Sequence, residues 1–289
     1  MLAPSCKHWQ FSVHGRQLAV MEWGNPEGDP VIALHGWLDN AASFTLLAHH
    51  LPHIRLIALD LAGHGLSDHR PLGQPYYVWD NVADVQALVE HLGLDKVVLL
   101  GHSLGAGIAT LFAGAFPEQV RRMILLDGLV PLDYPAEQLP ELMGKALRRG
   151  ARLGRRSLRP YASFEEALQA RINSRWPVSR EAATWLLERG LKQASDGWVW
   201  RSDIALTQPS LVRLCEAQIV AFVRRLSMPV KLIMAEQGEE RPLIENLLHR
   251  VPDLEFNTLP ASHHLHLEPE PARQIADWIS QRLQADKEA

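Results

Sequence analysis

One serine stands where a strand-like run of residues gives way to a helix-like run. Ser103 lies in the stretch "KVVLLGHSLGAGIATLFAGAF", with glycines two positions before and two positions after it. A serine hydroxyl is a weak nucleophile unless it is held where a base and a substrate can both reach it. A sharp strand-to-helix turn does this, and Gly101 and Gly105 remove the side chains that such a turn would crowd. The pattern therefore predicts that Ser103 is a nucleophile.

The base that would activate this serine has to be chosen among 14 histidines. The segment "LPASHHLHLEPEP" follows the last strand-like run, "LEFNTL", and precedes the last helical pattern. A histidine there would hang over the same sheet edge as Ser103, and the chain order serine, acid, histidine fits this kind of turn. His263 and His264 are therefore the two candidate bases. His102 is expected to point away from its neighbour Ser103, and His64 to shape the site.

The acid that would orient the base has two possible positions. Asp127 ends the run "MILLD", so it should stand at the tip of the strand beside the serine. The alternative is the turn after "VKLIMA", which contains Glu236, Glu239 and Glu240 but no aspartate. Position favours Asp127, and the glutamates stay as alternatives.

A turn after another buried strand offers the groups that would stabilise an oxyanion. In "ALHGW" the backbone N–H of Trp37 can act together with the N–H of Leu104, the residue after the nucleophile. His35, Gly36 and His102 are predicted to border the substrate pocket. The pair His35-Gly36 can equally form a tight turn with a packed imidazole.

No metal site or cofactor is expected. The histidines of "HHLPH" and of the C-terminal segment have no carboxylate or cysteine at metal-binding spacing in the sequence.

The elements that must position these residues follow from periodicity. Short unbroken apolar runs are typical of strands that are buried on both faces of a parallel sheet, and several of them alternate with helical patterns. The runs are "PVIALHG", "IRLIALDLAGHG", "KVVLLGHS", "RRMILLDG" and "MPVKLIMAE". This alternation predicts an α/β fold with a mostly parallel central sheet and helices on both faces. A strand pair that turns at His14-Gly15 is expected before it.

The alternation breaks after Asp127 and resumes at Pro229. The intervening stretch contains helical patterns and no strand-like run of the same kind, which predicts a helical cap over the carboxyl edge of the sheet, where open α/β sheets bind ligands. The predicted domains are a core of residues 1–128 and 228–289 and a cap of residues 129–227.

Composition restricts the possible classes of protein. Of the 289 residues 47% are hydrophobic and 21% are charged, and the formal net charge is −4, so nucleic-acid binding is not expected. Only two cysteines are present, the start has no signal-peptide pattern, and no apolar run is long enough for a membrane span. A cytoplasmic protein with a small-molecule substrate is expected, and a homo-oligomer is possible.

A basic stretch lies inside the predicted cap. Residues 145–159 contain seven cations and no acid: Lys145, Arg148, Arg149, Arg152, Arg155, Arg156 and Arg159. A solvated helix face is the favoured interpretation. The alternative is a site that attracts an acidic ester, an acyl-CoA or an anionic lipid surface.

Taken together, "LHGW", "DLAGHGLS", "GHSLGAG", "LLDG" and "SHHLHLEPE" resemble the α/β-hydrolase superfamily from end to end, and "LHGWLDNAASF" with "LLERGLKQASDGWVWRSDIAL" resembles its serine hydrolase-like subgroup. The resemblance implies that His263 is the catalytic histidine. Most relatives carry the acid in a "G-x-x-D" turn after the strand that matches "KLIMA", but this chain has "EQGEERP" there. Relatives with helical caps, such as haloalkane dehalogenases, can place it one strand earlier, where Asp127 stands.

The residues and the resemblance together predict a serine hydrolase. The expected substrate is a small carboxylic ester or related acyl compound, cleaved by Ser103, His263 and Asp127 through an acyl-enzyme. Carbon–carbon bond hydrolases, perhydrolases and acyltransferases use the same triad, so these activities remain alternatives. A binding protein that has lost the chemistry is the alternative from another class.

Overall fold

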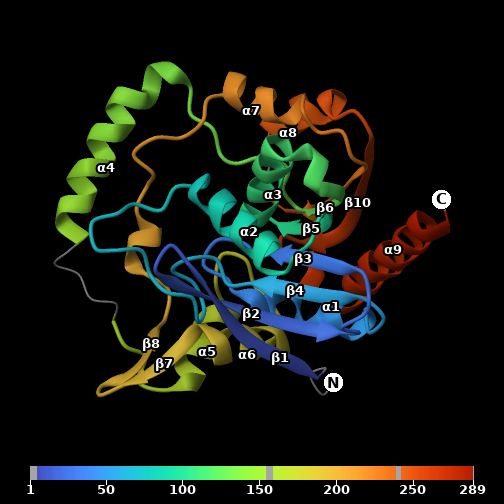
Figure 1. Cartoon of the computed structure of the whole chain (residues 1–289). Coiled ribbons are helices and arrows are strands. Elements are labelled where there is room, and N and C mark those ends of the chain that lie inside the picture. Colours follow the sequence, from blue (N-terminus) through green and yellow to red (C-terminus); the bar gives the residue numbers. More distant parts are fainter. Residues whose placement is uncertain (1–4, 154–158, 239–241, 289) are drawn as a thin grey trace.

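The computed structural model describes residues 5–153, 159–238 and 242–288. One eight-stranded sheet runs through the molecule in the order β1-β2-β4-β3-β5-β6-β9-β10 (Figure 1). The strands are β1 (Cys6–Val13), β2 (Arg16–Gly24), β3 (Pro30–Leu34), β4 (Arg55–Leu59), β5 (Val97–His102), β6 (Val120–Leu126), β9 (Val230–Gln237) and β10 (Leu254–Ser262).

The strands β4, β3, β5, β6, β9 and β10 are parallel, whereas β1 and β2 are antiparallel to their neighbours. Register brings the ends of the central strands level, since His102 pairs with Leu126 and Leu126 pairs with Ile233. The residues that follow β5, β6 and β10 therefore lie at one edge of the sheet.

Helices cover both faces of the sheet. They are α1 (Thr45–His50), α2 (Asp80–His91), α3 (Leu104–Ala115), α4 (Leu139–Leu153), α5 (Phe164–Ile172), α6 (Arg180–Gly190), α7 (Glu216–Val223), α8 (Pro242–Leu247) and α9 (Pro269–Glu288). Side chains of α2, α3 and α7 pack with one face of the sheet, and side chains of α1 and α9 pack with the other. The fold class predicted from the sequence is confirmed.

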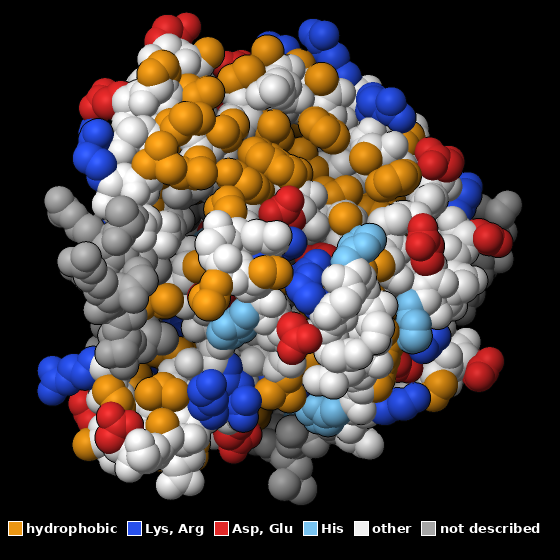
Figure 2. All heavy atoms as spheres, turned by 60° about the vertical axis from the view of Figure 1, so that its left-hand side comes forward, with side chains coloured by type: hydrophobic (Ala, Val, Ile, Leu, Met, Phe, Trp, Pro, Cys, Tyr) orange, Lys and Arg blue, Asp and Glu red, His pale blue; other side chains and the backbone are white. Residues whose placement is uncertain are grey.

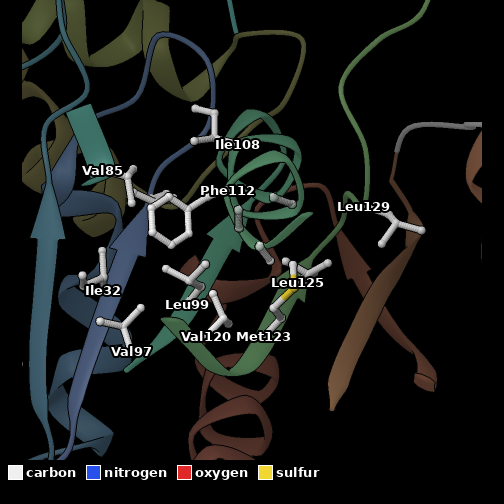
Figure 3. Packing of buried hydrophobic residues seen from close by; sticks show 14 of the residues in the cluster. Ile32, Val85, Val97, Leu99, Ile108, Phe112, Val120, Met123, Leu125 and Leu129 are labelled. Carbon is white, nitrogen blue, oxygen red and sulfur yellow. The ribbon is translucent and has the colours of Figure 1, made fainter. Parts of the chain in front are cut away.

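The core on the α3 side holds the helix that follows the candidate nucleophile. Ile108 and Phe112 of α3 are fully buried in the same cluster as Leu99 of β5 and Leu125 of β6, and Phe112 points from α3 toward the sheet (Figure 3). Burial of each such side chain contributes about 1.5–3 kcal/mol to folding. This packing fixes α3 rigidly under the sheet edge.

The segment between β6 and β9 differs from the predicted all-helical cap in two ways. It contains a hairpin, β7 (Leu191–Ala194) and β8 (Gly197–Trp200), that the sequence analysis missed because its strands have only four residues each and are mostly half exposed. The helical pattern before Pro229 forms α7, which starts only at Glu216.

One helix of the predicted cap packs on the sheet domain. Ile219, Val220 and Val223 of α7 belong to the same buried cluster as α2 and α3. The helix α7 therefore contributes to the core on this face, although it lies within the range 129–227 predicted for the cap.

No helix in the described part of the chain is long and apolar enough to cross a membrane.

Candidate active site

The candidate nucleophile lies on a strained turn between β5 and α3. Ser103 has φ 51° and ψ −110°, a conformation that side-chain-bearing residues rarely adopt. Its N–H donates to the carbonyl of Leu126 at 3.0 Å, and its carbonyl accepts from the N–H of Ala106 at 3.1 Å. These bonds hold the serine at the tip of β5 in spite of the strain.

The two flanking glycines have steric reasons to be there. A Cβ atom on Gly105 would lie 1.9 Å from the carbonyl oxygen of Leu34 in β3, and one on Gly101 would lie 2.6 Å from the carbonyl oxygen of Gly105. Both distances are far below van der Waals contact with backbone atoms that cannot move aside. The close approach of α3 to β3 and β5 therefore requires glycine at both positions.

The candidate acid stands at the tip of the next strand. Asp127 follows β6, is wholly buried and has φ 45°. Its Oδ1 accepts from the N–H of Ala235 at 2.9 Å, and its Oδ2 lies 2.5 Å from Nδ1 of His263. The carboxylate is thus fixed from β9 on one side and held against the imidazole on the other.

The candidate base lies directly after β10. The Nε2 of His102 donates to the carbonyl of His263 at 2.8 Å. The next turn is closed by Glu268, which accepts from the N–H of Ser262 at 2.8 Å. His263 is therefore positioned through its backbone as well as through its Nδ1.

The structure brings Ser103 and His263 into one cavity. Within the described residues, no hydrogen bond joins the two side chains. Such bonds are often long in unliganded enzymes and shorten when substrate binds.

Of the alternative acids, the structure describes Glu236 alone. Glu236 is exposed at the end of β9, and Glu239 and Glu240 lie outside the described residues. A Cβ on Gly238 would lie 2.4 Å from Oδ1 of Asp127, so the turn after β9 packs directly on that carboxylate. The carboxylate of Asp127 thus fills the space next to the turn after β9.

The two predicted oxyanion donors are backbone N–H groups of residues in the cavity wall. Those of Trp37 and Leu104 have no protein acceptor in the described part of the chain, and both residues line the cavity with Ser103. The N–H of Leu38, which has φ 62°, is instead tied to Nε2 of His64 at 3.2 Å. Burial lowers the pKa of His64 to about 3, which keeps its Nε2 a neutral acceptor and the turn in place.

The three predicted pocket residues are placed differently from one another. Gly36 and His102 line the cavity, but His35 does not. His35 is fully buried, its Nδ1 donates to the carbonyl of Gly36 at 2.8 Å, and its Nε2 accepts from the N–H of Leu61 at 3.0 Å. The predicted pocket role of His35 is wrong, because its ring is used entirely to close the turn.

His264, the alternative base, contacts a different acid. Its Nε2 lies 2.9 Å from Oδ2 of Asp39, and Arg171 of α5 lies 3.3 Å from Asp39 Oδ1 and 3.3 Å from His264 Nε2. Burial alone would raise the pKa of Asp39, but the charges of His264 and Arg171 outweigh it and hold that pKa well below its usual value. His264 therefore belongs to a cluster that joins the cap segment to the core.

Arg171 also contacts the loop that carries Trp176. Its Nη1 donates to the carbonyl of Trp176 at 2.8 Å and to Oγ of Ser174 at 3.0 Å. The ring of Trp176 lies 4.9 Å from that of His263, centroid to centroid. One guanidinium thus links the loop beside the base to Asp39 in the turn after β3. The sequence analysis missed this arrangement, because its members are far apart in the chain.

A second buried ion pair joins the cap to the core. Arg189 of α6 donates through Nε to both carboxylate oxygens of Asp60, at 2.9 and 3.0 Å, and both side chains are almost fully buried. Asp60 follows β4 and also accepts the N–H groups of Ala41 and Leu66. This pair, too, was not predicted.

One group of side chains has donor atoms close enough for a metal ion. Asp39, His102 and His264 offer ligand atoms within 4.8 Å of one another, so the sequence-based statement that no carboxylate accompanies these histidines is wrong. Arg171 already supplies a positive charge at Asp39 and His264. A metal ion would have to displace that guanidinium.

The cavity has a volume of about 840 Å³, which is in the upper part of the range for small-molecule sites. Its wall combines residues of the core with residues of the inserted segment. The aromatic side chains in it are Trp37, Tyr76, Tyr77, Trp79, Trp176 and Trp200.

The strand order, the strained serine turn and the histidine after the last strand define the α/β-hydrolase fold. A family model described as alpha/beta hydrolase fold matches residues 29–206, and the chain belongs to this family. Within it the chain belongs to the serine hydrolase-like subgroup, as the motifs indicated.

Three relatives illustrate this membership. A probable serine hydrolase of Drosophila melanogaster is 30% identical over 85% of this chain and 78% of its own length. Serine hydrolase-like protein 2 of Homo sapiens is 30% identical over 95% of this chain and 93% of its own. The crystal structure of a hypothetical protein from Pseudomonas aeruginosa PAO1 is 42% identical, with a TM-score of 0.91 over 96% of this chain and 99% of that one.

Proposed function

We propose that the protein is a serine hydrolase that cleaves a carboxylic ester or a related acyl substrate through an acyl-enzyme. The family and the serine hydrolase-like relatives support hydrolase activity. The proposal of an acyl substrate and an acyl-enzyme rests chiefly on the buried 2.5 Å contact between Asp127 Oδ2 and His263 Nδ1. His263 lines the same cavity as Ser103.

In the first half of the reaction Ser103 Oγ attacks the acyl carbonyl while Nε2 of His263 takes its proton. The N–H groups of Trp37 and Leu104 stabilise the oxyanion, and a donor of this kind is typically worth about 3 kcal/mol in the transition state. Asp127 accepts the hydrogen on Nδ1 of His263, so it fixes the tautomer and stabilises the imidazolium. The leaving group then takes the proton from His263, and the acyl-enzyme remains.

In the second half a water molecule gives a proton to His263 and attacks the acyl carbon. The tetrahedral intermediate collapses, Ser103 regains its proton from His263, and the acid is released. The step needs a water path to Ser103, which the open cavity provides.

Burst kinetics with p-nitrophenyl esters test this proposal. With an ester whose acyl-enzyme hydrolyses more slowly than it forms, the intact protein should release a burst of nitrophenol equal to the enzyme concentration before the slower steady rate, because the acyl-enzyme accumulates. The Ser103→Ala variant should give neither burst nor steady rate above that of the solvent. An unchanged rate in this variant would refute the assignment of Ser103.

A further inference from the structure

The cavity that holds Ser103 carries more positive than negative charge. Four guanidinium groups line it, and two carboxylates do so. The arginines are Arg149, Arg171, Arg175 and Arg213, and the acids are Asp39 and Asp203. The chain as a whole has a formal net charge of −4, so this excess is local.

The two carboxylates already have partners. Asp39 is held by His264 and Arg171. Asp203 accepts the hydroxyl of Tyr76 at 2.8 Å. Neither acid forms an ion pair with Arg149 or Arg213 among the described residues, so the positive charge of these two arginines is not neutralised by the carboxylates of the cavity wall.

Arg149 and Arg213 come from two different parts of the inserted segment. Arg149 is exposed on α4, the helix that contains most of the basic stretch noted in the sequence. The guanidinium of Arg213 stacks over the ring of Tyr134, 4.2 Å from its centroid, which fixes the plane of the group. Neither has a carboxylate partner in the parts of the chain that the structure describes. Of the same basic stretch, Lys145 pairs with Glu141, and the side chains of residues 151–158 lie outside the description.

The remainder of the wall is mainly apolar. On the face that carries α4, hydrophobic side chains gather into one broad patch (Figure 2). Leu132, which lines the cavity, and Leu147 of α4 are both more than half exposed. A cavity of about 840 Å³ with such a wall suits a long hydrocarbon chain better than a short polar acyl group.

We propose that the substrate is an amphiphilic acyl ester or thioester whose leaving group carries a phosphate. The acyl chain would lie along the apolar wall, and the phosphate would remain at the exposed rim beside Arg149 and Arg213. Arginine is suited to this role, since its planar fork binds phosphate oxygens in pairs. The inference rests on the proposed function and names the substrate class for that same site.

The chemistry is that of the proposed hydrolysis. The bond from the acyl carbon to Ser103 Oγ forms, the bond to the thiol sulfur or alcohol oxygen breaks, and His263 returns the proton to this leaving group. Water then releases the carboxylic acid. The phosphate takes no part in bond making, so it acts on binding and association alone.

Two matched substrate pairs test the inference. Decanoyl-CoA is compared with decanoyl-pantetheine, and 1-decanoyl-glycerol 3-phosphate with 1-decanoyl-glycerol; within each pair the acyl chain and the bond cleaved are the same. For at least one pair we expect kcat/KM to be about tenfold higher for the phosphorylated member, mostly because its KM is lower. A tenfold ratio corresponds to the free energy of two partly exposed ion pairs. The pair that shows the preference tells whether the phosphorylated substrate is a thioester or an oxygen ester. The preference should shrink in 0.5 M salt.

The double variant Arg149→Gln/Arg213→Gln should lose this preference, so that kcat/KM becomes equal for the two members of each pair. Arg225→Gln is the matched control, because Arg225 is an exposed arginine that does not line the cavity. Equal kcat/KM within both pairs, or a preference that the double variant retains, would overturn the inference while leaving the hydrolase proposal intact. Absence of hydrolysis for all four compounds would instead count against the proposed function itself.

Discussion

Asp127 is bound on two sides, by the N–H of Ala235 and by Nδ1 of His263. This arrangement explains why the turn after β9, where most relatives carry the acid, needs no aspartate in this chain. The carboxylate reaches the histidine from the tip of β6, and the turn after β9 closes over it at Gly238. An acid on that turn would have to share this space. At the scale of single residues, the proposed triad therefore depends on one backbone conformation, the positive φ of Asp127.

The variant Asp127→Asn tests the proposed acid. An amide in this position can favour the wrong tautomer of His263, so kcat should fall by about 10³–10⁴-fold. Steady-state hydrolysis of a p-nitrophenyl ester measures the effect. Glu236→Gln, which removes the exposed glutamate of β9, is the control and should keep its activity. The opposite pattern would move the role of acid to the glutamates after β9.

Single residues could be predicted from the sequence where each follows directly on a strand. Ser103, Asp127 and His263 come directly after strand-like runs of the sequence, and in the structure they directly follow β5, β6 and β10. His35 was assigned wrongly because the pattern "LHG" does not say which way a ring points. The cluster of Asp39, Arg171 and His264 could not be predicted, because only the folded chain brings three such distant residues together.

At the scale of elements, the helix α3 lies so close to the strand β3 that a side chain at Gly105 would collide with the backbone of that strand. The carbonyl of Leu34 in β3 stands where a Cβ of Gly105 would be. The sequence predicted the strand, the turn and this helix correctly, since periodicity and glycine spacing are local signals. The hairpin β7–β8 was missed because two four-residue strands carry no comparable signal.

Gly105→Ala should destabilise the fold. The added methyl group collides with backbone atoms, so we expect the free energy of unfolding to fall by about 1–3 kcal/mol or more. Gly144→Ala in α4 is a matched control, because its Cβ would meet only the flexible side chain of Arg148, at 3.4 Å. That change should be neutral or stabilising by up to about 1 kcal/mol. Urea unfolding measures both, and equal effects would contradict the steric explanation.

Arg171 connects the cap segment to the loops that carry the oxyanion donor and the base. Arg171→Ala leaves Asp39 buried without its guanidinium, so we expect a loss of about 3 kcal/mol in stability. We also expect kcat/KM to fall at least tenfold, as Trp176 and the turn after β3 lose a common support. Arg171→Lys should restore stability in part, because lysine cannot reproduce the forked contacts.

The control for Arg171 is another arginine of the cap segment. Arg180 of α6 pairs with Glu165 at 2.6 Å, but both side chains are more than half exposed. Arg180→Ala should change stability by less than about 1 kcal/mol and leave activity unchanged. If both arginine variants behaved alike, the position of Arg171 beside the site would have no special significance.

At the scale of the whole molecule, the two cores on the faces of the sheet share an edge that is rich in buried histidines. Burial lowers the pKa values of His35, His64, His102 and His266, and for His64 and His266 the values are about 3. Each is neutral in the folded protein at pH values where the unfolded chain takes up a proton. Because the unfolded state then binds more protons, the free energy of unfolding falls as the pH decreases below about 6.5.

The protein should therefore be stable above pH 6.5 and lose stability steeply on acidification toward pH 4. Each of these histidines contributes up to about 1.4 kcal/mol per pH unit in that range. His266→Leu removes one of them, a ring that packs against Phe44 and whose two nitrogens have no hydrogen-bond partner among the residues that the structure describes. Urea unfolding at several pH values should show a slope that is smaller by about one proton in this variant. An unchanged slope would contradict the assignment of a neutral, buried His266.

The central claim is that the fold holds Ser103 as an activated nucleophile, and labelling with a fluorophosphonate probe tests it most directly. Such a probe reacts with a serine that its base has activated. Peptide mass mapping should place a single adduct on Ser103, and the Ser103→Ala variant should remain unlabelled. His263→Ala should react at least a hundredfold more slowly. Failure of the folded protein to react, or an adduct on another residue, would contradict the account.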